Sequence, residues 1–316
     1  MKFATTPIRP LTAIGVGLAA VGVIALSGPP STPDLRLAAA TGAVTAPAQG
    51  AYWHTRTLFK ITHPRQLGSG SNRYWVEEQN ISESWTSPDG RSWFGFRKLG
   101  TRPKSAADEK AWRRDGSPTR WSRTAEGTTV SLSTTPNKGR VVLTKGPASF
   151  PVAGQQLSYE ELQRLPADPT GLKNWIEKAV RVPKAEPDAE IPEDAVDGQV
   201  TGTLTMLLHE VPVPKEVRVA AYRALPTMPG VRSLGKVKDA LGRTGEGFSI
   251  DHRQARQKNL KVVAKTDVII DTDAMSLLAE NLKSTRNGKP FLNKTWTRTM
   301  LQVGWTDDKP SVPALP

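Results

Sequence analysis

The 316-residue chain contains no cysteine, and this absence excludes several kinds of chemistry. Disulfide bonds, thiolate nucleophiles, cysteine-ligated metals and lipid attachment through a lipobox all require a thiol. Histidine is also scarce, and its four residues lack the spacing of a metal site; they are His54, His63, His209 and His252. His209-Glu210 begins like a zinc-protease motif, but Val213 stands where the second histidine is needed. We therefore expect no metal, no cofactor and no catalytic residues, which predicts a protein that is not an enzyme.

Long apolar runs are equally rare, because the chain has one, from Leu11 to Leu26. It follows a short basic start, Lys2 and Arg9, and residues 27–30 end it with serine, glycine and two prolines. This order is typical of a signal peptide or a signal anchor over residues 1–30. The small residues 38–40 that suit a signal peptidase lie far beyond the apolar run. We favour a single-pass membrane anchor through residues 11–28 with the rest of the chain outside the cytoplasm, and the alternative is secretion after cleavage.

Acidic residues are outnumbered, since 43 Lys and Arg face 30 Asp and Glu, for a formal net charge of +13. Outside a cell, such a balance favours contact with anionic lipid headgroups or cell-wall phosphate over nucleic acid. We expect no nucleic-acid partner. A solvated basic surface without a dedicated ligand is the simpler interpretation.

Residues 31–50 are small, polar and rich in proline and alanine, which predicts a flexible linker before an extracytoplasmic α+β domain over residues 51–316. The domain opens with alternating, β-branched and aromatic runs at 51–61, 73–86 and 91–99, and Ser-Pro-Asp-Gly at 87–90 predicts a hairpin turn. Two further short strands are expected at 128–133 and 139–144.

The middle of the chain predicts helices. Ser158 and Glu161 form a capping box, and Asp168-Pro169 starts a helix that places Leu172, Trp175, Ile176 and Ala179 on one apolar face. An exposed acidic, proline-rich loop is expected over residues 182–198, followed by helices at 201–210 and 214–225. Strands return at 233–238, 247–251, 260–271, 275–281 and 295–305. This order predicts an α+β fold with a curved antiparallel β-sheet and helices packed on one face.

A cation site at Asp267, Asp271 and Asp273 is a less satisfactory interpretation than a turn. Apolar strands flank Asp271-Thr272-Asp273, and aspartates in that position accept hydrogen bonds from their own turn. No glycine or distal glutamate follows at the spacing of a calcium loop. We therefore expect a hairpin turn there.

Tryptophan is the most unusual positive signal, because six of the nine residues fall between Trp53 and Trp121. Such rings suit either an apolar groove for a lipid or partner chain, or the core of a sheet covered by helices. The candidate ligand-binding residues are Trp53, Trp75, Trp85 and Trp93. We expect the helices after Ser158 to close a cavity over these strands, large enough for an acyl chain.

Several segments in this order resemble an uncharacterised actinobacterial family. They are the AYWHTRT opening, the aromatic strands around SPDG, the helix pair LSYEELQRLPADPTGLKNWI, the helix HEVPVPKEVRVAAYRALPTMPGV and the strand-turn VIIDTD, across about residues 50–305. The resemblance implies one N-terminal transmembrane segment, an extracytoplasmic domain and, in many members, a gene beside that of an extracytoplasmic-function sigma factor. More distantly, the chain resembles the lipoprotein-carrier and sigma-regulator fold, a curved antiparallel sheet with helices across its concave side.

The expected function is non-enzymatic binding or sensing at the cell envelope, with an apolar ligand such as a lipid or lipoprotein, or an envelope or regulatory protein, as the partner. The resemblance brings no catalytic residues with it. Two alternatives remain: a hydrolase acting on envelope material with a dispersed site, and a purely structural envelope protein. A fold-level likeness supports function only weakly.

Overall fold

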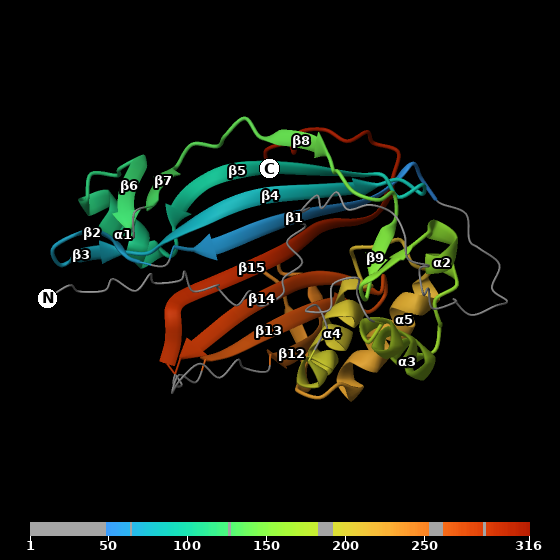
Figure 1. Ribbon diagram of the computed structural model, residues 1–316. Coiled ribbons are helices and arrows are strands. Elements are labelled where there is room, and N and C mark those ends of the chain that lie inside the picture. Colours follow the sequence, from blue (N-terminus) through green and yellow to red (C-terminus); the bar gives the residue numbers. More distant parts are fainter. Residues whose placement is uncertain (1–48, 64, 126–127, 183–191, 253–261, 287–288) are drawn as a thin grey trace, which may run out of the picture.

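The computed structural model describes residues 49–63, 65–125, 128–182, 192–252, 262–286 and 289–316. Its centre is a nine-stranded sheet in the order β11-β12-β13-β14-β15-β1-β4-β5-β8, and every neighbouring pair is antiparallel. The α+β prediction is confirmed. The first strand of the described residues, β1, pairs with the last, β15, so segments far apart in the sequence lie side by side at the middle of the sheet (Figure 1).

The strands of the main sheet are β1 (Tyr52–Thr62), β4 (Val76–Thr86), β5 (Ser92–Pro103), β8 (Arg140–Leu143), β11 (Val231–Lys238), β12 (Thr244–His252), β13 (Val262–Asp271), β14 (Ser276–Arg286) and β15 (Lys289–Thr306). Five of the eight pairings contain a register shift, for example between Arg56 and Thr57 where β1 meets β15. Because an extra residue bends its strand and increases its twist, these shifts account for the curvature of the sheet in Figure 1.

Helices cover one face of the sheet over its C-terminal strands (Figure 1). They are α2 (Tyr159–Gln163), α3 (Pro169–Val180), α4 (Glu193–Met206) and α5 (Lys215–Ala224), and the 3-10 turn η2 (Leu225–Thr227) follows α5. The hairpin of β9 (Phe150–Val152) and β10 (Gln155–Leu157) precedes them. We call the helix-bearing side of the sheet the inner face and the opposite side the outer face.

The helix starts follow the sequence signals. Ser158 Oγ accepts the Glu161 amide at 3.2 Å, and Glu161 Oε2 accepts the Ser158 amide at 2.7 Å, which completes the predicted capping box. Asp168 Oδ1 accepts the Gly171 amide at 2.6 Å with Pro169 in the first turn of α3. The apolar face of α3, including Trp175 at 7% exposure, lies in the main core as predicted.

The main core joins these helices to strands β12 to β15. Its strand members include Phe248, Val268, Ile270, Leu277 and Met300. Among the described residues, none from β4, β5 or β8 belongs to it. The helices therefore cover only part of the inner face, and the tryptophan-rich strands β4 and β5 lie beyond the core beneath them.

A smaller unit sits at the other end of β4 and β5, and consists of β2 (Leu67–Ser69), β3 (Asn72–Tyr74), α1 (Ala106–Arg114), β6 (Arg120–Ala125) and β7 (Thr128–Ser133) (Figure 1). Leu67, Tyr74, Val76, Ala111 and Leu132 form its own buried cluster. The sequence analysis did not predict α1 or β6. The signal for α1 was Ser105, whose hydroxyl accepts the Asp108 amide at 3.2 Å.

One prediction needs correction, and some lie on residues that are not described. Residues 193–198 of the predicted loop form the first turns of α4, while 183–191 lie outside the described residues. The short strands expected at 128–133 and 139–144 are present as β7 and β8, of which β7 pairs with β6 and β8 joins the edge of β5. The predicted leader over residues 1–30 and most of the predicted linker also lie outside the described residues. In the described part of the chain, no helix is long and apolar enough to cross a membrane.

Candidate functional site

The four candidate tryptophans do not gather at one place. Trp53 points to the inner face, where its Nε1 donates to the carbonyl of His209 at 2.9 Å and its ring meets Trp305 edge-on at 5.7 Å. Its exposure is 5%. Trp53 therefore fills the junction between β1 and the helix-covered part of the inner face.

Trp85 and Trp93 lie on the outer face, opposite each other on β4 and β5. The Trp85 ring stacks on His54 at 4.8 Å, and Trp93 meets Tyr52 edge-on at 5.5 Å. Trp75 precedes β4 and is half-buried at the far end of that strand, where its amide donates to Asp108. The alternating run expected at 73–86 is therefore interrupted at Trp75, which separates β3 from β4.

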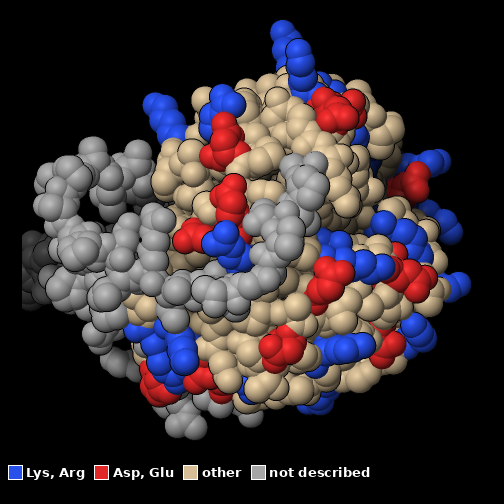
Figure 2. All heavy atoms as spheres, turned by 90° about the vertical axis from the view of Figure 1, so that its right-hand side faces the viewer, with Lys and Arg blue, Asp and Glu red and all other residues tan. Residues whose placement is uncertain are grey.

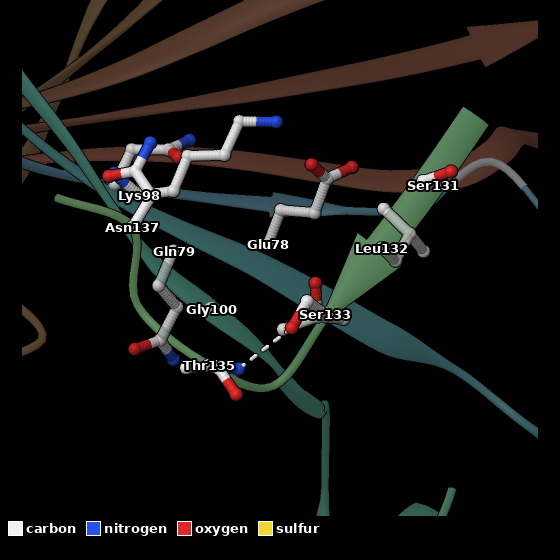
Figure 3. Close-up of a pocket in the computed structure, with 11 residues that line it drawn as sticks. Glu78, Gln79, Lys98, Gly100, Ser131, Leu132, Ser133, Thr135 and Asn137 are labelled. Atoms are coloured by element: carbon white, nitrogen blue, oxygen red, sulfur yellow. Dashed lines mark hydrogen bonds between the residues drawn. The ribbon is translucent and has the colours of Figure 1, made fainter. Parts of the chain in front are cut away.

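A small pocket of about 120 Å³ lies where β7 approaches β4 and β5, and none of the four tryptophans lines it. Figure 3 shows Glu78, Lys98 and Asn137 around it, with Leu132 and Ser133 on the opposite side. Its volume is well below the range of roughly 300–1,000 Å³ typical of ligand pockets. It is therefore not the acyl-chain cavity expected between the tryptophan-rich strands and the helices.

The part of the inner face beyond the helices carries a half-buried aromatic surface. Residues opposite each other on antiparallel strands share a face, which puts Phe94 beside Ser84 and Phe96 beside Ser82 on the same face as Trp53. Phe94 and Phe96 stack at 6.5 Å, and Phe59 on β1 contacts Trp296 on β15 at 5.7 Å. At the edge of the sheet Val142 on β8, opposite Phe94, is 47% exposed. We call Phe59, Phe94, Phe96, Val142 and Trp296 the aromatic half-face.

A partly buried charged cluster borders the aromatic half-face. Arg298 is the register partner of Phe59, and its guanidinium carbon lies 5.8 Å from the Phe59 ring centre. The guanidinium donates to Glu280 and to Glu210, each at 3.2 Å. The side chains of Arg298 and Glu210 are 17% and 25% exposed. The cluster can therefore meet a ligand lying on the aromatic half-face.

The turn after α4 holds His209 and Glu210 in place. His209 Nδ1 donates to the Thr205 carbonyl at 3.2 Å, because a carbonyl oxygen only accepts, and its Nε2 faces Glu210 Oε1 at 3.2 Å. The carbonyls of the same turn accept hydrogen bonds from surrounding side chains: His209 from Trp53, Pro212 from Gln163 at 2.7 Å and Val213 from Arg218 at 2.7 Å. The turn is thus fixed to β1, α2 and α5.

Electrostatics keep this cluster ionised. Burial alone would raise the pKa of Glu210, but His209 and Arg298 outweigh it and lower that pKa to about 2. Burial alone would lower the pKa of Arg298, yet Glu280 and Glu210 raise it. The one guanidinium of Arg298 thus lies between two carboxylates, those of Glu210 and Glu280. Such a site favours a hydroxyl or amine over another anion.

This cluster was not expected from the sequence. His209-Glu210 resembles only the start of a metal motif, and Glu280 and Arg298 lie on strands with no motif around them. In the described part of the chain, no group of three or more His, Asp and Glu residues could hold a metal ion. The aspartate turn was predicted correctly, since Asp271 Oδ1 accepts the amides of Asp273 and Ala274 at 2.9 and 3.0 Å.

No protein-family model matches the chain, and no curated protein matches it.

Proposed function

We propose that this protein binds an amphipathic lipid-like ligand on the inner face of its sheet, with the apolar chain on the aromatic half-face and the polar head beside Arg298 and Glu210. The observation that carries this proposal is the incomplete cover of the inner face. Helices bury β12 to β15, while Phe94 and Phe96 on β5 stay half-buried and Val142 remains 47% exposed. Adjacent partly exposed aromatic and aliphatic side chains of this kind mark binding surfaces more often than isolated ones do.

The polar border of the surface supports an amphiphile over a pure hydrocarbon. Ser82 and Ser84 offer hydroxyls between the phenylalanines, and the Ser84 hydroxyl is already 2.7 Å from that of Thr55. The two carboxylates beside Arg298 offer acceptor oxygens, which favours a head that carries a hydroxyl or amine. A few polar groups at the edge of an apolar surface fix the orientation of such ligands.

We propose binding and not catalysis as the role of the charged cluster. An efficient general base has a pKa near the working pH, whereas the pKa of Glu210 is lowered to about 2. Its carboxylate is also occupied by Arg298 and faces His209. These properties suit a group that holds a fixed charge for a ligand head.

The chain offers a matched pair of variants that tests the ligand site. Val142 and Leu143 are neighbours on β8, with 47% and 57% exposure, and alternate between the inner and outer faces. Val142→Asp should weaken binding of a long-chain lipid at least about tenfold, because the charge would sit opposite Phe94 where the chain lies. Leu143→Asp should leave binding unchanged. Both are measured by titrating tryptophan fluorescence with lipids bearing neutral, cationic and anionic heads.

Native mass spectrometry of the purified chain provides the second readout for the same pair. A co-purified lipid should be present in the unmodified chain and in Leu143→Asp, and reduced in Val142→Asp. Equal binding by both variants would contradict the proposed surface. A preference for anionic heads would contradict the assigned role of Arg298 and Glu210.

We also propose an extracytoplasmic location with attachment through residues 11–28, which rests on the basic start and apolar run of the sequence. Charge on the folded part gives no separate membrane patch in the view of Figure 2, where basic and acidic side chains are interspersed. Protease added to intact, wall-stripped cells should digest the folded part while a cytoplasmic marker survives. Complete protection of the chain would contradict this location.

A further inference from the structure

Residues 307–316 run back across the outer face of the sheet. Figure 1 shows this segment turning at the end of β15 and passing beside β8 and β5. Arg56 on β1 donates to the Ala314 carbonyl at 2.9 Å, and Pro313 is buried. The segment therefore docks on the face that carries Trp85 and Trp93, opposite the proposed lipid surface.

Two glycines shape the place where the segment docks. A Cβ on Gly95 would lie 3.1 Å from the Pro313 ring and 3.0 Å from the Trp85 ring, so the glycine lets the proline ring approach β5 closely. A Cβ on Gly139, which has φ +69°, would lie 2.8 Å from a methyl carbon of Val312. We call the surface formed by Arg56, Trp85, Gly95 and Gly139 the outer groove.

The docked segment has the chemistry of a polyproline II ligand. Prolines recur at every third position, 310, 313 and 316, and the polyproline II helix has three residues per turn. The Arg56 side chain donates a hydrogen bond to the backbone carbonyl of Ala314 in this segment. Grooves that recognise such peptides combine aromatic rings with donors to peptide carbonyls, as Trp85 and Arg56 do here.

Buried polar atoms of the outer groove remain available for a better-matched peptide. Trp85 Nε1 and His54 Nδ1 have no hydrogen-bond partner among the described residues, although Trp85 and His54 are only 2% and 5% exposed. The other nitrogen of His54 is bound to Glu83 at 2.9 Å. Trp93 extends the aromatic surface next to Trp85 and is only half-buried.

We propose that the outer groove is a binding site for an extended, proline-containing segment of another protein, which displaces residues 307–316. The expected partner segment has a proline between small apolar residues, as Val312-Pro313-Ala314 has. The chain's own segment occupies the groove in the absence of the partner and competes with it. A tethered competitor acts at an effective concentration in the millimolar range, so it weakens the apparent affinity of any external peptide.

The test uses the full chain and a fluorescent peptide of the sequence DDKPSVPALP, followed by fluorescence anisotropy. Pro313→Asp removes the anchor of the internal segment and leaves the outer groove intact. This variant should bind the peptide at least about tenfold more tightly than the unmodified chain does. A peptide with aspartate in place of its second proline should bind neither protein.

A second substitution identifies the groove. Gly95→Leu in the Pro313→Asp background should abolish peptide binding, because the side chain fills the space of the proline ring; thermal unfolding confirms that the variant is folded. Hydrogen exchange on the unmodified chain should show added peptide exposing residues 307–316. Equal peptide binding with and without Pro313→Asp, or binding that survives Gly95→Leu, would overturn the proposal. Lipid binding on the inner face is measured separately and does not depend on this result.

Discussion

Trp175→Ala is expected to lower the free energy of unfolding by about 3–5 kcal/mol, the usual range for removing a large aromatic side chain from a core. Trp175 is 7% exposed and belongs to the cluster that joins α3, α4 and α5 to the sheet. Its loss leaves a cavity that the surrounding helices cannot close fully. Urea unfolding followed by circular dichroism measures the change, and a loss below about 1 kcal/mol would show that the helix does not contribute this core contact.

Two further variants test whether Trp175 acts through its packing in the core. One replaces the indole with a phenyl ring, which lacks the nitrogen, and the other removes a tryptophan outside the core. Trp175 Nε1 has no hydrogen-bond partner among the described residues, so Trp175→Phe should cost less than half as much as Trp175→Ala. Trp75 is half-buried and belongs neither to the main core nor to the buried cluster of the smaller unit, so Trp75→Ala should cost only about 1 kcal/mol. Equal losses from Trp75→Ala and Trp175→Ala would contradict the assigned core.

Arg298→Leu is expected to destabilise the fold by about 3–5 kcal/mol, because it leaves the buried carboxylate of Glu280 and the partly exposed carboxylate of Glu210 without their shared cation. Glu210 and Glu280 each contact Arg298 at 3.2 Å, and the Glu280 side chain is only 10% exposed. Glu210→Gln combined with Arg298→Leu should cost less than the sum of the single changes, since the two residues interact. Strict additivity would contradict a coupled cluster.

The pH dependence of stability is a second readout for the same cluster. The pKa of Glu210 is lowered from 4.5 to about 2, so its contribution is complete above about pH 4.5 and is lost as pH falls through 2. The shift corresponds to roughly 3 kcal/mol lost between those values. Glu210→Gln should reduce the fall in the free energy of unfolding between about pH 4.5 and pH 2. The same pH dependence in the variant would mean that Glu210 is not held ionised by Arg298 and His209.

Much of the fold was predictable because local signals and tertiary packing agree in it. The capping box at Ser158, the Asp168-Pro169 start of α3 and the turn at 87–90 each specify their own element within a few residues. Alternation also placed Trp85 on one face of β4. The edge position of β8 and the pairing of β6 with β7 were not predictable, since strand partners depend on contacts beyond the local pattern.

The candidate site was less predictable for a physical reason. Arg298 and Glu210 are 88 positions apart, and only the pairing of β1 with β15 brings Arg298 to Phe59. The tryptophans were the candidate residues because they are numerous, yet they lie on two faces of the sheet. Trp53 is on the inner face, and Trp85 and Trp93 are on the outer face. The half-buried phenylalanines Phe94 and Phe96 belong to no motif that would indicate a binding surface, because alternating aromatic residues are typical of any strand.

The most direct test of lipid binding on the inner face is photo-crosslinking of the full chain with a long-chain phospholipid that carries a diazirine in its acyl chain. Peptide mapping by mass spectrometry then locates the modified residues. We expect modification at Phe94, Phe96 and Val142, and its loss when unlabelled lipid is added in excess. Modification confined to Trp85, Trp93 and Leu143 on the outer face, or no modification that unlabelled lipid can displace, would contradict the proposed function.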